Sequence, residues 1–282
     1  MSENIDQLIL EFVKQSESKF PSIFIDYYFC GSRVDKSSNK NSDLDIILVI
    51  NKDISKEIQD SFGMFLDKFN TYPVIETCTL DTRDLVDLPA WAKFAKHIYG
   101  KDSFKNIPLE SLEDSKKRFI HGVYRFLYIF LRDSKNQLVY PLSLPDENKD
   151  FYGYKINQTE YGLSTKRFVS ATARICGALL SLKYDYQPKS KKDSIESYAK
   201  LSQCKFTTYV LDCYQKLSKD WDYKVPKDKE SLKVFYELLK VYNQFENHFL
   251  EEIKLYMIDL SNINCEDVWF KNCKKMIYLY KV

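Results

Sequence analysis

The chain has 282 residues, of which 44% are hydrophobic and 29% are charged, and its formal net charge is +2. This length is sufficient for two domains, and the balance of apolar and charged residues excludes an intrinsically disordered chain. The near-neutral net charge gives no indication of an extended contact with nucleic acid or with a membrane surface.

The first third of the chain mixes strand and helix patterns. Runs rich in β-branched and aromatic residues predict strands over residues 23–29, 44–50 and 73–80. Apolar residues at helical spacing predict helices over residues 5–13, 54–69 and 84–99. Gly100 would end the third of these helices, because glycine is favoured just past a helix C-terminus. The strand over residues 44–50 is apolar without interruption after Asp45, which predicts burial on both faces.

From about residue 110 onward, the apolar residues follow helical periodicity. This pattern predicts helices over residues 113–133, 166–184, 194–201, 207–219 and 229–260. Residues 135–150 contain two prolines and are expected to form a loop. We therefore expect a small α/β domain over residues 1–110, followed by an all-helical domain over residues 111–282.

Two carboxylates lie one residue apart where the second strand begins. Asp43 and Asp45 flank Leu44, and side chains at positions i and i+2 of a strand point to the same face of the sheet. Their negative charges repel each other unless a cation lies between them, and Mg²⁺ prefers such oxygen ligands. Glu76 lies within the third predicted strand, where a carboxylate is unusual unless it is paired or bound to a metal.

Gly31 and Ser32 are expected to form a turn directly after the first strand. Glycine allows the backbone to approach a ligand closely, and backbone N–H groups at such a turn can bind phosphate. A phosphate-binding turn opposite a carboxylate pair predicts a site for a metal ion and a nucleotide.

A family pattern is present in this stretch, made of Cys30-Gly31-Ser32, a ten-residue spacer and Asp43-Leu44-Asp45-Ile46. It resembles the nucleotidyltransferase superfamily with the polymerase-beta-like fold. It is especially similar to the enzymes that adenylylate aminoglycosides, and it also resembles the minimal nucleotidyltransferases of toxin–antitoxin systems. The match covers residues 24–50, with a weaker extension to residue 80. The resemblance implies an α+β fold, in which a small mixed-sheet nucleotidyltransferase domain precedes an all-helical domain.

The resemblance implies a role for each acidic residue of the motif. Asp43 and Asp45 would bind Mg²⁺ and, through it, the triphosphate of a nucleoside triphosphate (NTP). Glu76 is the candidate for a third carboxylate, with Asp81 as the alternative. This third carboxylate would complete the metal site, accept the proton of the attacking hydroxyl group, or do both.

The resemblance also implies the nucleotide-binding residues. Gly31 and Ser32 would hold the β- and γ-phosphates, and Arg33 would add a charge-assisted contact. Residues 167–201 look like the C-terminal helices of the aminoglycoside enzymes, and the Ser-Lys pair at a helix start would place Lys191 against phosphate. Three tyrosines are candidates for lining a substrate pocket: Tyr152, Tyr154 and Tyr161.

The expected activity is the Mg²⁺-dependent transfer of a nucleoside monophosphate from an NTP to a hydroxyl group of a small molecule, with an aminoglycoside-like molecule as one candidate acceptor. One alternative is a toxin-like nucleotidyltransferase that acts on RNA or protein. Another is a non-catalytic nucleotide-binding protein. The motif indicates the reaction class, whereas the acceptor and the preferred base stay open.

A cytoplasmic location is expected. The N-terminal segment MSENIDQLIL is acidic and polar, unlike a secretory signal, and the apolar runs are too short or too polar to span a bilayer. The seven cysteines are scattered and include no Cys-x-x-Cys pair, which argues against a disulfide framework and against a zinc ribbon.

Overall fold

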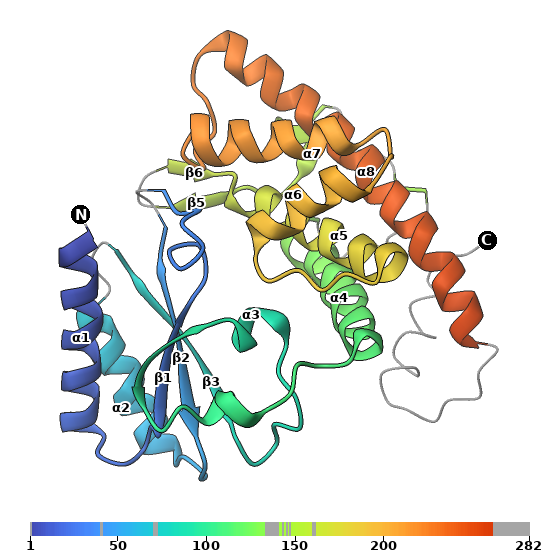
Figure 1. Cartoon of the computed structure of the whole chain (residues 1–282). Helices are drawn as coiled ribbons and strands as arrows, with labels where there is room; N and C mark the ends of the chain where they lie inside the picture. Colours follow the sequence, from blue (N-terminus) through green and yellow to red (C-terminus); the bar gives the residue numbers. More distant parts are fainter. Residues whose placement is uncertain are drawn as a thin grey trace. The chain divides into compact units, whose positions relative to one another are not determined.

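Figure 1 shows a computed structural model of the chain, which describes residues 2–39, 42–69, 73–132, 141–142, 144, 146, 148–159 and 162–261. The chain divides into two compact units, Met1–Ser111 and Leu112–Val282. The loop expected over residues 135–150 and the candidate Tyr161 lie largely or wholly outside the described residues.

The first unit is built on a four-stranded mixed sheet with the strand order β3-β2-β1-β4. Its strands are β1 (Asp26–Cys30), β2 (Leu44–Ile50), β3 (Ile75–Asp81) and β4 (Lys96–Gly100). Strand β2 runs antiparallel to β1 and parallel to β3, and β4 runs antiparallel to β1. The expected small mixed sheet is therefore confirmed, and β2 has the bounds that the sequence predicted.

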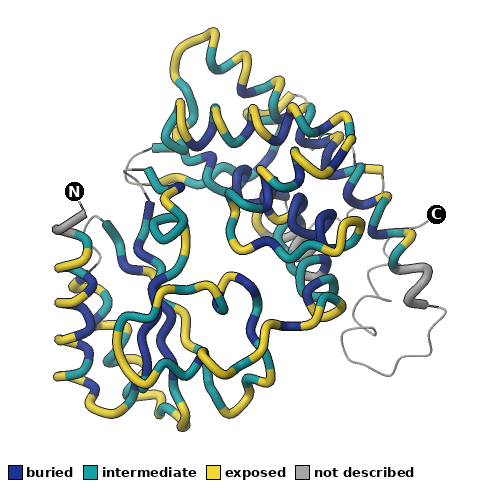
Figure 2. Tube along the Cα trace, in the orientation of Figure 1, coloured by how far each residue is buried: buried dark blue, intermediate teal, exposed yellow. Residues whose placement is uncertain are grey.

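The two faces of this sheet are covered by different segments (Figure 1). Helices α1 (Ser2–Lys19) and α2 (Lys56–Leu66), the latter continued by a 3₁₀ turn at Asp67–Phe69, pack on one face. The other face packs against the segment that contains α3 (Ala90–Lys93) and the 3₁₀ turn Ser103–Asn106. Strands β1 and β2 lie between these layers and are mostly buried (Figure 2).

The helix predicted over residues 84–99 is wrong. Only α3 is helical there, and β4 follows it as an edge strand paired with β1. A buried carboxylate explains this outcome, because Asp26 of β1 accepts hydrogen bonds from the backbone N–H groups of Asp102 and Ser103. Gly100 ends a strand rather than a helix, with φ +109°, and its backbone lies against the Ile25 carbonyl. Tertiary pairing overrides the local helical pattern.

The second unit is mainly helical. Its helices are α4 (Leu112–Phe126), α5 (Lys166–Tyr184), α6 (Lys191–Leu201), α7 (Thr207–Tyr214) and α8 (Lys229–Ser261). Single π-helical segments follow α4 at Leu127–Leu131 and α7 at Gln215–Asp220, and a 3₁₀ turn lies at Asp150–Gly153. Helix α5 has the predicted bounds, and it is buried on nearly every side because small residues let its neighbours approach.

Two details of the second unit differ from the expectation. A small antiparallel hairpin of β5 (Asn157–Thr159) and β6 (Gly162–Ser164) interrupts the helices, so the unit is not all-helical. Strands of three residues are too short to show an alternating pattern. Tyr154 is a core residue that donates a hydrogen bond of 2.7 Å to buried Glu246, so it does not line an open pocket as expected. Within the described residues, no helix is both long and apolar enough to cross a membrane.

Candidate functional site

Three carboxylates meet at one end of the sheet. Asp43 immediately precedes β2, Asp45 is the second residue of β2, and Glu76 is the second residue of β3. The parallel register pairs Asp45 with Glu76, so these two side chains point to the same face. Carboxylate oxygens of all three residues lie within 4.8 Å of one another. The structure thus brings together the three acidic residues that the sequence singled out.

This acidic triad has the ligand chemistry of a divalent metal site. Asp43 and Asp45 are half-buried, while Glu76 is exposed at the edge of the cluster. Three like charges at this separation repel one another, and a hard cation with oxygen ligands removes that repulsion. Across the described part of the chain, no other three metal-ligating side chains approach each other in this way.

The alternative third carboxylate lies elsewhere. Asp81 is at the opposite end of β3, five residues beyond Glu76, which corresponds to roughly 16 Å along an extended strand. Its carboxylate accepts a hydrogen bond of 3.0 Å from Arg83 Nε, and this contact lowers the pKa of Asp81. Glu76, and not Asp81, is therefore the acidic residue beside the aspartate pair.

The Gly31 turn lies directly against Asp45. Gly31 has φ +80°, and a Cβ atom placed there would lie 2.0 Å from Asp45 Oδ2. The turn is tight, because the Gly31 carbonyl accepts a hydrogen bond from the Val34 N–H and the Ser32 carbonyl accepts one from the Ser37 N–H. Glycine is required here for its backbone conformation and for its lack of a side chain. The turn predicted to bind phosphate is therefore adjacent to the acidic triad.

Arg33 makes a contact that the sequence did not indicate. Its Nε donates hydrogen bonds of 3.2 Å to the carbonyl oxygens of Ser42 and Asp43, and its Nη2 donates one of 2.5 Å to Ser42. The guanidinium group thus joins the start of the loop after β1 to its end before β2. This contact holds the backbone of Asp43 in place. A phosphate contact by Arg33 stays a prediction.

Sequence reasoning also missed two residues that shape this site. Ser42 is buried, and its hydroxyl accepts a hydrogen bond of 3.0 Å from the Asn39 N–H, which closes the loop immediately before Asp43. Cys30 is the register partner of Asp45 on β1. Burial and the negative charge of Asp45 raise the pKa of the Cys30 thiol to about 12, so this neighbour is neutral. The position of Ser42 in the Ser-Asp-x-Asp motif is the sequence signal that could have identified it. Only the strand register identifies Cys30.

Lys191 is the first residue of α6 in the second unit. The preceding residue, Ser190, caps this helix, since its hydroxyl accepts a hydrogen bond of 3.2 Å from the Asp193 N–H. Helix capping accounts for Ser190 in the Ser-Lys pair. The phosphate contact expected of Lys191 stays a prediction.

Comparison with known proteins supports a fold assignment. Sequence searches find no matching family model and no matching curated protein. The structure is similar to that of spectinomycin adenyltransferase AAD(9) from Enterococcus faecialis, which was solved with ATP and spectinomycin. The TM-score is 0.50 at 12% sequence identity, and the alignment covers 84% of this chain and 97% of the other. This chain therefore has a nucleotidyltransferase-like fold.

Proposed function

We propose that this protein is a nucleotidyltransferase that transfers a nucleoside monophosphate from an NTP to a hydroxyl group of a small molecule. The observation that carries the proposal is the acidic triad of Asp43, Asp45 and Glu76, which lies beside the Gly31 turn. ATP is the first candidate donor and a small molecule the first candidate acceptor, because the similar structure was solved with ATP and spectinomycin. An aminoglycoside-like molecule is one candidate for this acceptor.

The triad fits Mg²⁺, and each carboxylate has a proposed task. Asp43, just before β2, and Asp45, the second residue of β2, would hold the ion. Bound there, Mg²⁺ supplies charge neutralisation for the triphosphate and stabilises the oxygens of an in-line displacement. Glu76 is the most exposed member of the triad, and in this position it can also accept the proton of the attacking hydroxyl group.

The backbone around Gly31 and Ser32 is proposed to bind the β- and γ-phosphates. This assignment rests on the absence of a Cβ atom at Gly31 and on the close approach of the turn to Asp45. Phosphoryl-type transfer depends mainly on positioning and charge neutralisation, so a rigid turn and three carboxylates are a sufficient set of groups. Arg33 contributes to this positioning through its contact with the Asp43 carbonyl.

The alternatives are less well supported. A non-catalytic nucleotide-binding role would be favoured if the third carboxylate were absent from the cluster, but Glu76 lies within it. An RNA acceptor would be favoured by a strong positive charge, and the net charge is only +2.

The test is a label-transfer assay. The purified protein is incubated with Mg²⁺ and each α-labelled NTP in turn, and then with an aminoglycoside panel that includes spectinomycin, with total RNA, or with cell lysate. Transfer to a small molecule supports the proposal, and transfer to RNA or protein would favour the toxin-like alternative.

Two variants make this assay specific for the site. Asp45→Asn removes one charge of the triad without changing side-chain size, and it is expected to abolish transfer. Asp81→Asn is the matched control on the same sheet, and it is expected to retain activity. If the unmodified protein shows neither transfer nor metal-dependent NTP binding, the proposal is wrong.

A further inference from the structure

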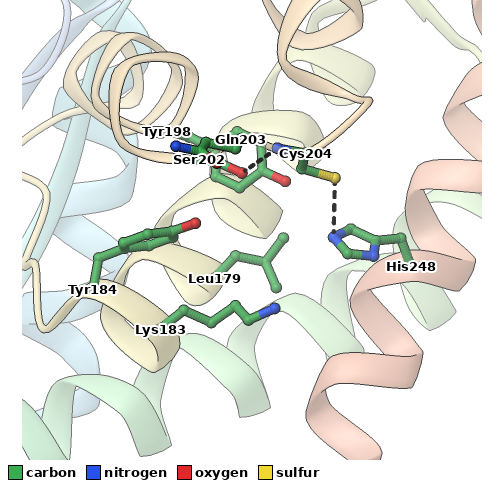
Figure 3. A pocket seen from close by; sticks show the side chains of 8 residues that line it. All are labelled: Leu179, Lys183, Tyr184, Tyr198, Ser202, Gln203, Cys204 and His248. Atoms are coloured by element: carbon green, nitrogen blue, oxygen red, sulfur yellow. Dashed lines mark hydrogen bonds between the residues drawn. The ribbon is translucent and has the colours of Figure 1, made fainter.

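The second unit contains a cavity that the proposed reaction does not use. Its volume is about 210 Å³, well above the roughly 15 Å³ that one water molecule needs. Figure 3 shows its lining, which comes from α5, from α6 with the turn that follows, and from α8. The lining residues are Leu179, Lys183, Tyr184, Tyr198, Ser202, Gln203, Cys204 and His248. All of them belong to the described part of the second unit.

A thiol and an imidazole face each other in this cavity. Cys204 Sγ and His248 Nε2 lie 3.5 Å apart, within hydrogen-bonding distance for sulfur (Figure 3). Both residues are only partly buried, and both line the cavity. Burial lowers the pKa of His248, which keeps its imidazole neutral and able to accept a proton. Glu252 acts on the pKa of the imidazole in the opposite direction, and its carboxylate is paired at 2.5 Å with Lys183.

A buried hydroxyl group provides independent evidence that the cavity accommodates a ligand. Tyr198 is 1% exposed, and its hydroxyl forms no hydrogen bond of ordinary geometry with any described residue. The side chains of Ser202 and Cys204 are the polar groups with which this hydroxyl interacts. Burial of a hydroxyl group without a well-formed hydrogen bond is costly. A polar atom bound at Cys204 would therefore gain a hydrogen-bond donor.

A metal ion does not fit this cavity well. Structural metal sites with thiolate and imidazole ligands take four protein ligands, and catalytic ones take three. Among the described residues, Cys204 and His248 are joined by no third ligating side chain at suitable spacing. The groups around the sulfur instead include an imidazole base and a hydroxyl group, which suit thiol chemistry rather than metal binding.

We propose that Cys204 is a site of reversible modification by low-molecular-weight disulfides, with the added group held in this cavity. His248 takes the thiol proton, and the Cys204 thiolate attacks one sulfur of the disulfide. A new sulfur–sulfur bond forms at Cys204 while the disulfide bond of the reagent breaks. The second half leaves as a thiolate and takes the proton from His248, so no further oxidant is needed.

The other described cysteines lack this environment. Cys176 and Cys213 are fully buried, and burial raises the pKa of both thiols. The Cys30 thiol is also held protonated by burial and by Asp45. Cys78 is an exposed residue on β3, but partial burial of its thiol and then the negative charge of Asp45 raise the pKa of that thiol. Cys78 therefore serves as an internal control for accessibility without activation.

The experiment exposes the full chain to bis(2-hydroxyethyl) disulfide and follows each cysteine by peptide mass spectrometry over time. Cys204 is expected to gain the 2-hydroxyethylthio group faster than Cys78, because only the Cys204 sulfur has an imidazole base within hydrogen-bonding distance among the described cysteines. A reductant should restore the free thiol. The proposal is overturned if Cys204 reacts no faster than Cys78, and this comparison needs no variant.

Variants then identify the groups responsible. His248→Gln and Tyr198→Phe are each expected to slow modification of Cys204 while leaving the rate at Cys78 unchanged. Tyr186→Phe is the matched control, since that hydroxyl donates to Asp193 at the start of α6 and does not line the cavity. If His248→Gln leaves the Cys204 rate unchanged, the assigned base is wrong. These rates are measured without NTP or acceptor, so the result is independent of the proposed transferase activity.

Discussion

Gly31→Ala separates the stability of the fold from the geometry of the site. Gly31 has φ +80°, a conformation that costs an alanine about 1–2 kcal/mol. The new methyl group would also lie 2.0 Å from Asp45 Oδ2 and 2.8 Å from Asp45 Cγ. Both atoms belong to the carboxylate, which can rotate away, whereas Asp45 Cβ at 3.2 Å needs only a shift of a few tenths of an ångström, so the clash is relieved mainly by moving the carboxylate. We therefore expect unfolding free energy to fall by only about 1–2 kcal/mol.

The loss of function should be much larger than the loss of stability. Moving the Asp45 carboxylate takes one of three ligands out of the triad, and a misplacement on the order of 1 Å can cost about 100-fold in rate. Gly31→Ala is therefore expected to lower kcat/KM at least about 100-fold and to weaken metal binding in the absence of NTP. Urea denaturation, Mn²⁺ titration and label transfer measure the three quantities on one preparation.

Gly63→Ala provides the matched control for Gly31→Ala. Gly63 lies inside α2, and a Cβ atom there would meet nothing within 4 Å. Alanine is better than glycine in a helix interior by about 1 kcal/mol, so this variant should be slightly more stable with unchanged activity. The reasoning fails if Gly31→Ala binds metal and turns over like the unmodified protein, because the turn would then not be close to Asp45.

Three further substitutions test other contacts of the structure. Arg33→Lys keeps the charge but loses the hydrogen bond to the Asp43 carbonyl, so Mn²⁺ affinity measured without NTP should fall. If Arg33 contacted only phosphate, this substitution would leave the Mn²⁺ affinity unchanged. Asp26→Asn removes a buried charge that accepts hydrogen bonds from Asp102 and Ser103 and lies 3.2 Å from the His97 ring, and urea denaturation should show a loss of about 1.5–3 kcal/mol. Glu246→Leu removes the carboxylate that pairs at 2.6 Å with the buried Arg132 guanidinium, and about 3–5 kcal/mol of stability should be lost by the same measurement.

Segments buried on nearly all sides were predicted with the bounds that the structure has. Strand β2 and helix α5 each present apolar or small residues to neighbours in almost every direction. The edge strand β4 was predicted as a helix because its conformation depends on pairing with β1, which is distant in the sequence. Asp26, which is 76 residues before Asp102, holds the segment after β4, and no local pattern reports that contact.

The candidate site was predictable where its geometry is local. Strand alternation alone places Asp43 and Asp45 on one face, and the glycine after β1 indicated a close backbone approach. The contact of Arg33 was not predictable, because its partners are backbone carbonyls at the far end of a loop and any residue type could supply them. The neutral neighbour Cys30 was missed for a similar reason, since only the register of β1 against β2 places it beside Asp45.

The choice between Glu76 and Asp81 shows how the core determines the site. Asp45 pairs with Glu76 because Leu44 pairs with Ile75, and these two buried residues belong to the core under α1 and α2. A slip of one residue would expose Ile75 and turn Glu76 toward that core, where an unpaired carboxylate is very costly. The apolar face of the sheet thus sets the register, and the register places the third carboxylate beside the other two. The acidic residues themselves repel one another, so they cannot be what holds the triad together.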